Sequence, residues 1–549
     1  MRKILLPLFV FVALSSFAQD TISKTDLISA SKLFDLSFTQ KEIDTMYDAV
    51  KDNTENYKLM HKLSLNNNVP LSLWQNPVLP GMKFPEKQEP VNWNIPNNIS
   101  LPKDKNELAY YSVLQLASLI KNKKISSVEL TRFFIDRLKK YGDTLQCVIS
   151  LTEDIAMQQA KQVDEEIARG KYRGLLQGIP YGLKDLFAVK GTKTTWGAAP
   201  YKDQVIDEDA FVYLKLKEAG AVLIAKFTMG ALAMGDYWFG GRTKNPWNLK
   251  YGSSGSSAGS ASATSAGLVP FAIGTETWGS IVSPASTCGV TGLRPTFGSI
   301  SRTGAMALSY SLDKVGVLSR SAEDAAIVFN YIHGTDGKDQ SAVNKPFNYK
   351  TNVDVKKLRI GYAKNYFDKI TDTSRNEWKV LQTFKQLGVQ LIPVDFPDSG
   401  VYNFNIMRAV LSSESAAEFD EFTRYNVDDE MTRQTKNDWP NEFRSRRLTS
   451  AVEYINAQRH RYLLMQKVNE VMGKFDAIIS PNWMGNQSAI TNLTGHPVIC
   501  IPSGFSKNDL PTSISIIGKL YDEATIIEVA KFYQDATEWN KMHPEMFKK

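Results

Sequence analysis

A stretch rich in serine and glycine is the first candidate for chemistry in this sequence. It runs from Gly252 to Gly267, and Ser280 follows it after an apolar run. A serine hydroxyl attacks carbonyl groups when a nearby base takes its proton. The composition alone also suits a flexible linker. Because the stretch lies within an unbroken, apolar-rich part of the chain, we interpret it as part of a folded site.

The same stretch contains a pattern of a different serine hydrolase class. Residues 255–259 satisfy G-x-S-x-G, the nucleophile elbow of α/β-hydrolases, which requires an apolar strand directly before it. The preceding residues, 245–254, read NPWNLKYGSS and cannot form a central strand. None of the five histidines stands in a triad-like context. The sequence therefore disfavours a Ser-His-Asp hydrolase.

Motifs in a fixed order make the sequence resemble the amidase signature family. That family has a Gly/Ser-rich segment, then G-T-D-x-G-G-S-I and G-x-x-G-x-K-P-T. Here the motifs are GSSAGSA at 255–261, GTETWGSI at 274–281 and GVTGLRPT at 289–296. A lysine motif, GIPYGLKD, precedes them at 178–185, and TGHPVICIPSG at 494–504 looks like the closing strand of the family. The resemblance extends from about residue 105 to residue 549.

The resemblance implies both a fold and a catalytic triad. The fold would be α/β, with a large mixed, mostly parallel twisted sheet flanked by helices on both faces. Ser280 would be the nucleophile, Ser256 the proton relay and Lys184 the base, with Ser257 as a supporting hydrogen-bonding residue. The family holds its relay serine after a cis peptide bond. We expect no cofactor, and no metal because the five histidines and three cysteines show no metal-ligand spacing.

The chemistry of amide hydrolysis accounts for these residue types. The reaction needs an activated nucleophile, stabilisation of the oxyanion, and a proton for the leaving amine. The oxyanion donors implied by the family are the backbone N–H groups of four residues: Thr277, Trp278, Gly279 and Ser280. A lysine is a base only when neutral, and burial with few counter-charges lowers its pKa. The residues around Lys184 are suitably apolar, and Asp185 would point to the opposite face of a strand.

The sequence departs from the family pattern at three positions near the nucleophile. Glu276 and Trp278 stand where the pattern has Asp and Gly, and Val282 replaces a frequent Arg. The Trp278 side chain leaves the backbone N–H groups intact but should reshape the acyl pocket. With Trp238 and Phe239 it indicates an aromatic, apolar pocket, although such residues also pack in cores. The substrate stays open among acyl, peptide and aryl amides, carbamates and esters.

Alternating helix and strand patterns surround these motifs. A capping box at 126–129 begins a helix with apolar residues at helical spacing. Further along, we expect helices at 209–219 and 376–387 and strands at 221–225, 358–362, 389–392, 477–479 and 497–501. This alternation is typical of an α/β sheet covered by helices.

The N-terminal residues predict export and a separate extension. Residues 1–18 have two basic residues, an apolar run at 4–14 and Ser16-Phe17-Ala18, as in a cleavable signal peptide. The apolar run is too short to span a bilayer. We therefore expect a periplasmic or secreted protein cleaved after Ala18, without stable membrane insertion. Residues 19–105 would be a helical extension and connector, with helices near 26–36 and 40–52, and residues 106–549 the catalytic domain.

The remaining composition narrows the partners. The net charge of +7 comes from 65 basic and 58 acidic residues, without a basic run that suggests nucleic-acid binding. The three cysteines form no disulfide framework or metal motif. We expect a small-molecule amide or peptide-amide substrate. The extension would cover the site or mediate dimerisation, so a homodimer remains open.

The sequence thus predicts an exported amidase that uses Ser280, Ser256 and Lys184. Two alternatives stay open. One is a protein similar to the A subunit of glutamine-dependent amidotransferases, which would work in the cytosol with partner subunits and nucleic acid. The other is a non-catalytic protein on the same fold.

Overall fold

The computed structural model describes residues 22–548 except 65, 68, 70 and 71. The predicted signal peptide at 1–18 lies outside the described residues. The chain divides into two compact units, residues 1–65 and residues 66–549. Among the described residues, no helix is long and apolar enough to cross a bilayer.

The first unit contains two helices, α1 (Lys24–Leu33) and α2 (Gln40–Met60). Both begin with a capping box, in which a side chain bonds the backbone N–H of the third helical residue and that residue's carboxylate bonds back. Helices were expected at 26–36 and 40–52. The second runs eight residues further than expected, to Met60 instead of Asp52.

The connector begins the second unit and packs on the rest of that unit. Gln88 exchanges two hydrogen bonds of 2.8 Å with the backbone of Phe347. Trp93 stacks on Tyr349 with ring centroids 5.2 Å apart. These contacts hold the proline-rich chain in place without regular secondary structure of its own.

The second unit is built on an 11-stranded sheet. Its spatial order is β1-β3-β2-β8-β10-β9-β14-β15-β13-β11-β12. The strands are β1 (Val148–Leu151), β2 (Pro180–Lys184), β3 (Val222–Phe227), β8 (Phe271–Glu276), β9 (Thr291–Arg294), β10 (Lys314–Ser319), β11 (Ile360–Ala363), β12 (Leu391–Val394), β13 (Ala477–Pro481), β14 (Val498–Phe505) and β15 (Pro511–Gly518). Two small hairpins lie outside the sheet: β4 (Tyr237–Trp238) with β5 (Gly241–Arg242), and β6 (Lys244–Asn245) with β7 (Asn248–Gly252).

The sheet is mixed, as expected, and its parallel pairs form two groups. One group joins β3, β2 and β8, and the other joins β13, β11 and β12. The pairs between these groups, and the pair of β1 with β3, are antiparallel. Fewer of the strand pairs are parallel than the alternation of helices and strands in the sequence suggested. One reason is that a short turn joins β14 to β15, and such a connection forces antiparallel pairing.

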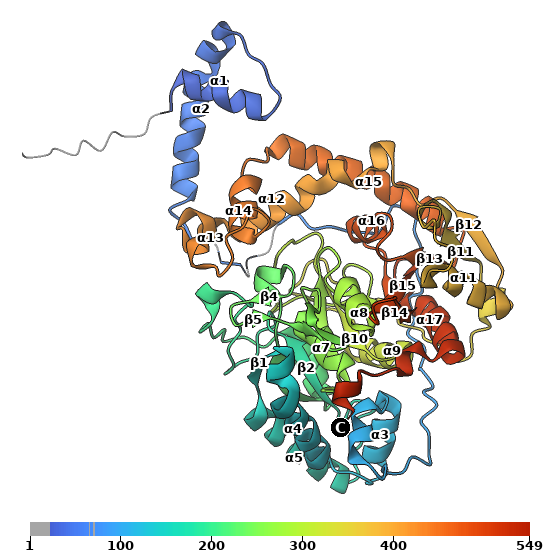
Figure 1. Cartoon of the computed structure of the whole chain (residues 1–549). Helices are drawn as coiled ribbons and strands as arrows, with labels where there is room; N and C mark the ends of the chain where they lie inside the picture. Colours follow the sequence, from blue (N-terminus) through green and yellow to red (C-terminus); the bar gives the residue numbers. More distant parts are fainter. Residues whose placement is uncertain (1–21, 65, 68, 70–71, 549) are drawn as a thin grey trace, which may run out of the picture. The chain divides into compact units, whose positions relative to one another are not determined.

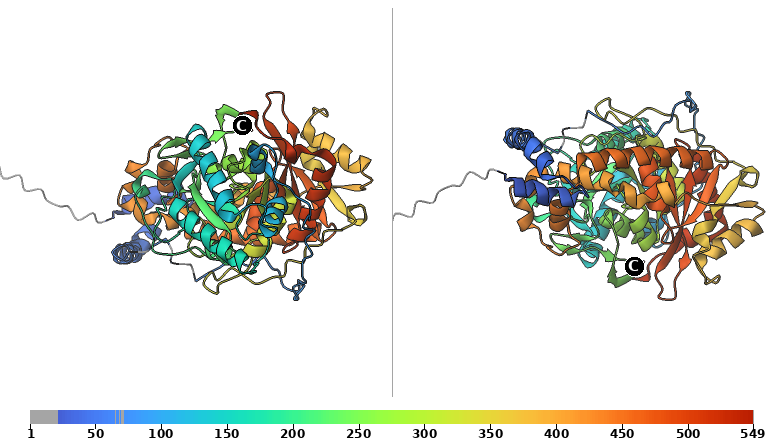
Figure 2. Two further views of the ribbon diagram at one scale, coloured as in Figure 1. Left: turned by 90° about the horizontal axis from the view of Figure 1, so that it is seen from below. Right: turned by 90° about the horizontal axis from the view of Figure 1, so that it is seen from above.

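Helices flank this sheet (Figures 1 and 2). At one edge α4 and α5 pack beside β1 and β3, and at the other α11 packs beside β12. The helices of this unit are α3 (Val113–Lys121), α4 (Ser127–Leu145), α5 (Glu153–Ala168), α6 (Phe211–Glu218), α7 (Ala258–Ser265), α8 (Val282–Cys288), α9 (Ala322–Ile332), α10 (Lys364–Phe367), α11 (Asn376–Gln386), α12 (Arg408–Glu418), α13 (Asp420–Arg424), α14 (Trp439–Arg446), α15 (Ala451–Met472), α16 (Gln487–Thr494) and α17 (Glu523–Thr537).

The serine-rich stretch forms helix α7 and the turn before it, and every residue of α7 is buried. Small side chains are required here because the backbone passes close to its neighbours. A Cβ atom on Gly259 would lie 2.4 Å from the carbonyl oxygen of Cys147. The stretch is therefore a packed element of the core and not a linker.

Candidate active site

Lys184 is the last residue of β2, and its side chain is completely buried. Its Nζ lies 2.7 Å from Oγ of Ser256 and 2.8 Å from Oγ1 of Thr275. A third contact, of 3.4 Å, goes to the carbonyl oxygen of Thr275. The structure thus brings the predicted base and the predicted relay serine into direct hydrogen-bonding contact.

The surroundings of Lys184 lower the pKa of its side chain toward neutral pH. Burial lowers the pKa of its ammonium group to about 7, although the carboxylates of Asp313 and Glu276 act in the opposite direction. A group with that pKa is about half neutral at pH 7. A neutral amine can accept a proton from the hydroxyl that it contacts.

The neighbouring Asp185 does not neutralise this lysine. Its carboxylate lies 3.0 Å from Nζ of Lys226, which is also fully buried. It also accepts a hydrogen bond of 2.8 Å from the backbone N–H of Thr195. The carboxylate next to the base in the sequence therefore serves a different cation.

The two serines after Gly255 have separate contacts. The peptide bond between Gly255 and Ser256 is cis, as the family resemblance implied. Ser257 donates from Oγ to the carbonyl oxygen of Thr275 at 3.0 Å and accepts from its N–H at 3.2 Å. The N–H of Ser257 also donates to the carbonyl oxygen of Ser280, at 3.1 Å. Ser257 thus ties the relay segment to the strand and loop that carry the predicted nucleophile.

Ser280 lies in the loop between β8 and α8, with 9% of its surface exposed. Within the described part of the chain its hydroxyl makes no hydrogen bond to another residue, so Ser256 and Ser280 are not bonded to each other. The backbone N–H groups of residues 277–280 likewise donate to no described loop carbonyl or side chain. Gly279 has φ +102°, a conformation that favours glycine. The loop thus offers a free hydroxyl and several unused donors.

Glu276 anchors this loop, a role that the sequence did not reveal. Its buried carboxylate accepts the N–H groups of Ile281 and Val282, each at 2.9 Å. It also accepts hydrogen bonds from Arg294 at 2.7 Å and Asn492 at 2.8 Å. Burial would raise the pKa of Glu276, but the Arg294 guanidinium and these donors lower it to about 2. The only sequence signal was Glu276 itself, which stands where the family pattern has Asp, and it did not point to these partners.

A cavity of about 490 Å³ adjoins the site. Thr275 and Thr277 line it, together with apolar residues that include Leu186, Trp196 and Met306. The aromatic residues expected in its wall lie elsewhere: Trp278 packs near Phe404, with centroids 6.1 Å apart, and Trp238 packs against Phe239 at 4.9 Å. The acyl pocket predicted from these three residues is therefore not the cavity observed.

Comparisons with known proteins agree with this fold. The family model described as Amidase matches residues 129–527. The chain belongs to the amidase signature family and is an amidase-family enzyme.

Relatives in sequence and in structure carry different names. The A subunit of the glutamyl-tRNA(Gln) amidotransferase of Coxiella burnetii is 33% identical over 481 residues, which cover 79% of this chain and 99% of that protein. The same subunit of Carboxydothermus hydrogenoformans is 32% identical over 486 residues, covering 80% of this chain and 100% of that protein. The peptide amidase of Stenotrophomonas maltophilia is 26% identical, with a TM-score of 0.71 over 79% of this chain and 98% of its own.

Proposed function

We propose that this protein cleaves the C–N bond of an amide through an acyl-enzyme on Ser280. Ser256 relays the proton and Lys184 is the base. One observation carries the proposal: the Lys184 amine is fully buried, has no carboxylate partner within salt-bridge distance in the described residues, and lies 2.7 Å from the Ser256 hydroxyl. A surface lysine in a turn would have none of these properties.

The geometry supports a defined sequence of proton transfers. Neutral Lys184 takes the Ser256 proton, and Ser256 takes the proton of Ser280, whose hydroxyl must turn toward it. The Ser280 oxygen bonds to the substrate carbonyl carbon, and the free N–H groups of 277–280 stabilise the oxyanion, with each donor worth about 3–4 kcal/mol. The intermediate then breaks its C–N bond, the relay returns a proton to the amine, and water releases the acyl group.

A second function has a specific observation in its favour. The relatives with 32–33% identity over nearly their full length are named amidotransferase subunits. By analogy, the same serine would release ammonia from an amide inside an assembly that acts on glutamyl-tRNA. The identity comparison favours this alternative over a stand-alone amidase. The predicted signal peptide favours the stand-alone, exported amidase.

The location of the protein separates the two functions. We propose export, and expect protein recovered from the periplasm or medium to begin at Gln19. Recovery from the cytosol with an intact N-terminus and co-purified subunits would instead support the amidotransferase function.

The chemistry is tested on the purified full chain with aryl amides, peptide amides and glutamine as substrates. We expect release of amine or ammonia by the protein alone, and its loss in Ser280→Ala. A fluorophosphonate probe should add its mass at Ser280. Labelling at another serine, or unchanged turnover in Ser280→Ala, would contradict the assignment of the nucleophile.

A further inference from the structure

Part of the cavity wall comes from the connector, before the region that the family model matches. Asn66 and Asn67 line the cavity, whereas the family model begins only at residue 129. The cavity volume, about 490 Å³, falls within the range of roughly 300–1,000 Å³ typical of small-molecule sites. A residue from outside the matched region thus borders the space next to Thr275 and Thr277.

Asn67 is held by three hydrogen bonds. Its Oδ1 accepts the N–H of Ala307 at 3.0 Å, and its Nδ2 donates to the carbonyl oxygen of Ala307, also at 3.0 Å. Nδ2 donates in addition to Oε2 of Glu418, at the end of α12, at 2.9 Å. Nearby, the hydroxyl of Tyr310 donates to the carbonyl oxygen of Val69 at 2.6 Å. These contacts fix the connector against the 302–310 loop.

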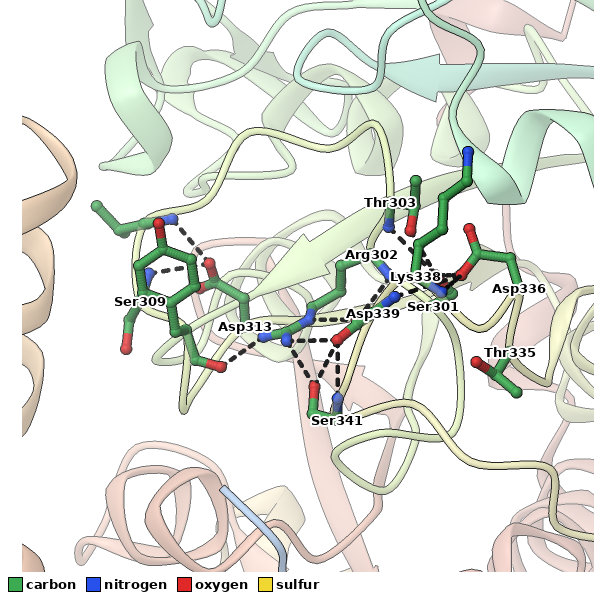
Figure 3. Close-up of polar contacts among 12 residues, drawn as sticks. Ser301, Arg302, Thr303, Ser309, Asp313, Thr335, Asp336, Lys338, Asp339 and Ser341 are labelled. Carbon is green, nitrogen blue, oxygen red and sulfur yellow. Dashed lines mark hydrogen bonds and ion pairs between the residues drawn. The ribbon is translucent and has the colours of Figure 1, made fainter. Parts of the chain in front are cut away.

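The same loop contacts the loop between β8 and α8, which carries Ser280, through Asp313. The N–H groups of Leu308 and Ser309 donate to Oδ2 of Asp313 at 2.8 and 2.9 Å. The other oxygen of Asp313 accepts the Thr277 hydroxyl at 2.5 Å. Figure 3 shows Asp313 beside Ser309, with Arg302 nearby. A continuous set of contacts therefore joins Asn67, through Ala307 and Asp313, to Thr277.

Arg302 in the cavity wall is paired, and Glu418, which bonds Asn67, is uncharged at pH 7. Arg302 bonds both carboxylate oxygens of Asp339, at 2.8 and 2.9 Å, and the carbonyl oxygen of Tyr310 at 2.6 Å (Figure 3). Burial, with the Asp313 and Glu414 carboxylates close by, raises the pKa of Glu418 to about 9, so that this side chain is neutral at pH 7. The apolar residues of the lining, which include Leu186, Trp196 and Met306, favour an uncharged acyl group, because a charged group would lose its hydration against them.

We propose that Asn67 is a specificity-determining residue, which sets the size of the acyl group accepted between the connector and Thr277. The substrate class is an amide with an uncharged, largely apolar acyl group. This inference rests on the proposed amide cleavage. It assigns the connector a role in substrate choice, beside the chemistry of Lys184, Ser256 and Ser280.

The test compares anilides that differ only in the acyl group: acetyl, benzoyl, 4-phenylbutyryl and succinyl. We expect the wild type to prefer the uncharged acyl groups over succinyl. In Asn67→Ala, the ratio of kcat/KM for 4-phenylbutyryl to that for acetyl should rise at least fivefold, because the wall is removed. If the alanine variant folds poorly, Asn67→Ser replaces it in the test, and the ratio should shift in the same direction. The exposed connector residue Asn94 supplies the control variant Asn94→Ala, which should keep the wild-type ratio.

Two kinds of failure are distinguishable. Active Asn67 variants that keep the wild-type ratio within twofold would overturn the specificity role and leave the proposed function intact. A wild-type preference for the succinyl anilide would overturn the assigned substrate class. If neither the wild type nor Asn94→Ala hydrolyses any anilide or reacts with the fluorophosphonate probe, the proposed function itself fails.

Discussion

Two buried lysines on neighbouring strands have very different surroundings. Lys184 on β2 and Lys226 on β3 have side chains with no exposed surface, and Leu183 pairs with Lys226 in the sheet. Lys226 contacts the Asp185 carboxylate at 3.0 Å and the Thr194 hydroxyl at 3.0 Å. Lys184 contacts only hydroxyl and carbonyl oxygens.

The counter-charge, and not burial, distinguishes the structural Lys226 from Lys184, the lysine that we propose as the base. Burial lowers the pKa of Lys226 as well, but the Asp185 carboxylate opposes this and stabilises the charged form. For Lys184, the fall of the pKa from 10.5 to about 7 corresponds to about 5 kcal/mol of disfavoured charging. The sheet thus places one carboxylate beside Lys226 and leaves Lys184 with a lowered pKa.

The largest expected effect separates the two lysines by their role in catalysis. Lys184→Met should lower kcat/KM for amide hydrolysis by about 10²–10⁴-fold, the usual contribution of a general base. The matched variant Lys226→Met should destabilise the fold and keep kcat within about tenfold in the folded fraction. Equal losses of kcat in the two folded variants would contradict the distinction. Steady-state kinetics with an aryl amide, alongside thermal unfolding, measures both.

A second effect concerns the counter-charge itself. Asp185→Asn leaves Lys226 buried without its carboxylate and should lower the free energy of unfolding by about 3–5 kcal/mol. Asp203→Asn removes the partner of Lys193 at the surface and should change the free energy of unfolding by less than about 1 kcal/mol. Urea denaturation of both variants provides the comparison. If the two variants had the same free energy of unfolding, the buried contact of Asp185 with Lys226 would contribute no more to stability than a surface ion pair.

The smallest effect is expected at the second hydroxyl that Lys184 contacts. Thr275→Val removes an acceptor of the Lys184 ammonium, so kcat should fall about three- to tenfold. The pH midpoint of kcat/KM should also move down, because the lost acceptor favoured the charged form. Thr264→Val, which removes a buried hydroxyl bonded only within α7, is the control and should not move the midpoint. A midpoint unchanged in Thr275→Val would argue against this contact.

The local parts of the fold were predictable from the sequence. The helix expected after the capping box at 126–129 is α4, and the strands expected at 358–362 and 477–479 are β11 and β13. These elements carry their own signals, because caps and apolar periodicity act over a few residues. The family motifs placed Lys184 and Ser256 for the same reason, since each motif is contiguous.

The long-range partners were not predictable. Glu276 pairs with Arg294, 18 residues away, and with Asn492, 216 residues away. Asn67 contacts Ala307 across 240 residues. Such pairs depend on the order of strands in the sheet and on the path of the connector, and no local pattern encodes either. The three aromatic residues predicted for the acyl pocket do not line this cavity, because aromatic side chains near a loop pack equally well away from it.

The pH dependence of Ser280 labelling tests the central claim most directly. The rate of reaction with a fluorophosphonate probe depends on the base but not on a leaving amine. We predict that the rate rises about tenfold per pH unit below pH 7 and levels off above it, since the Lys184 pKa lies near 7. A rate that is constant from pH 5 to pH 9, or that rises only near pH 10, would show that Lys184 is not the neutral base.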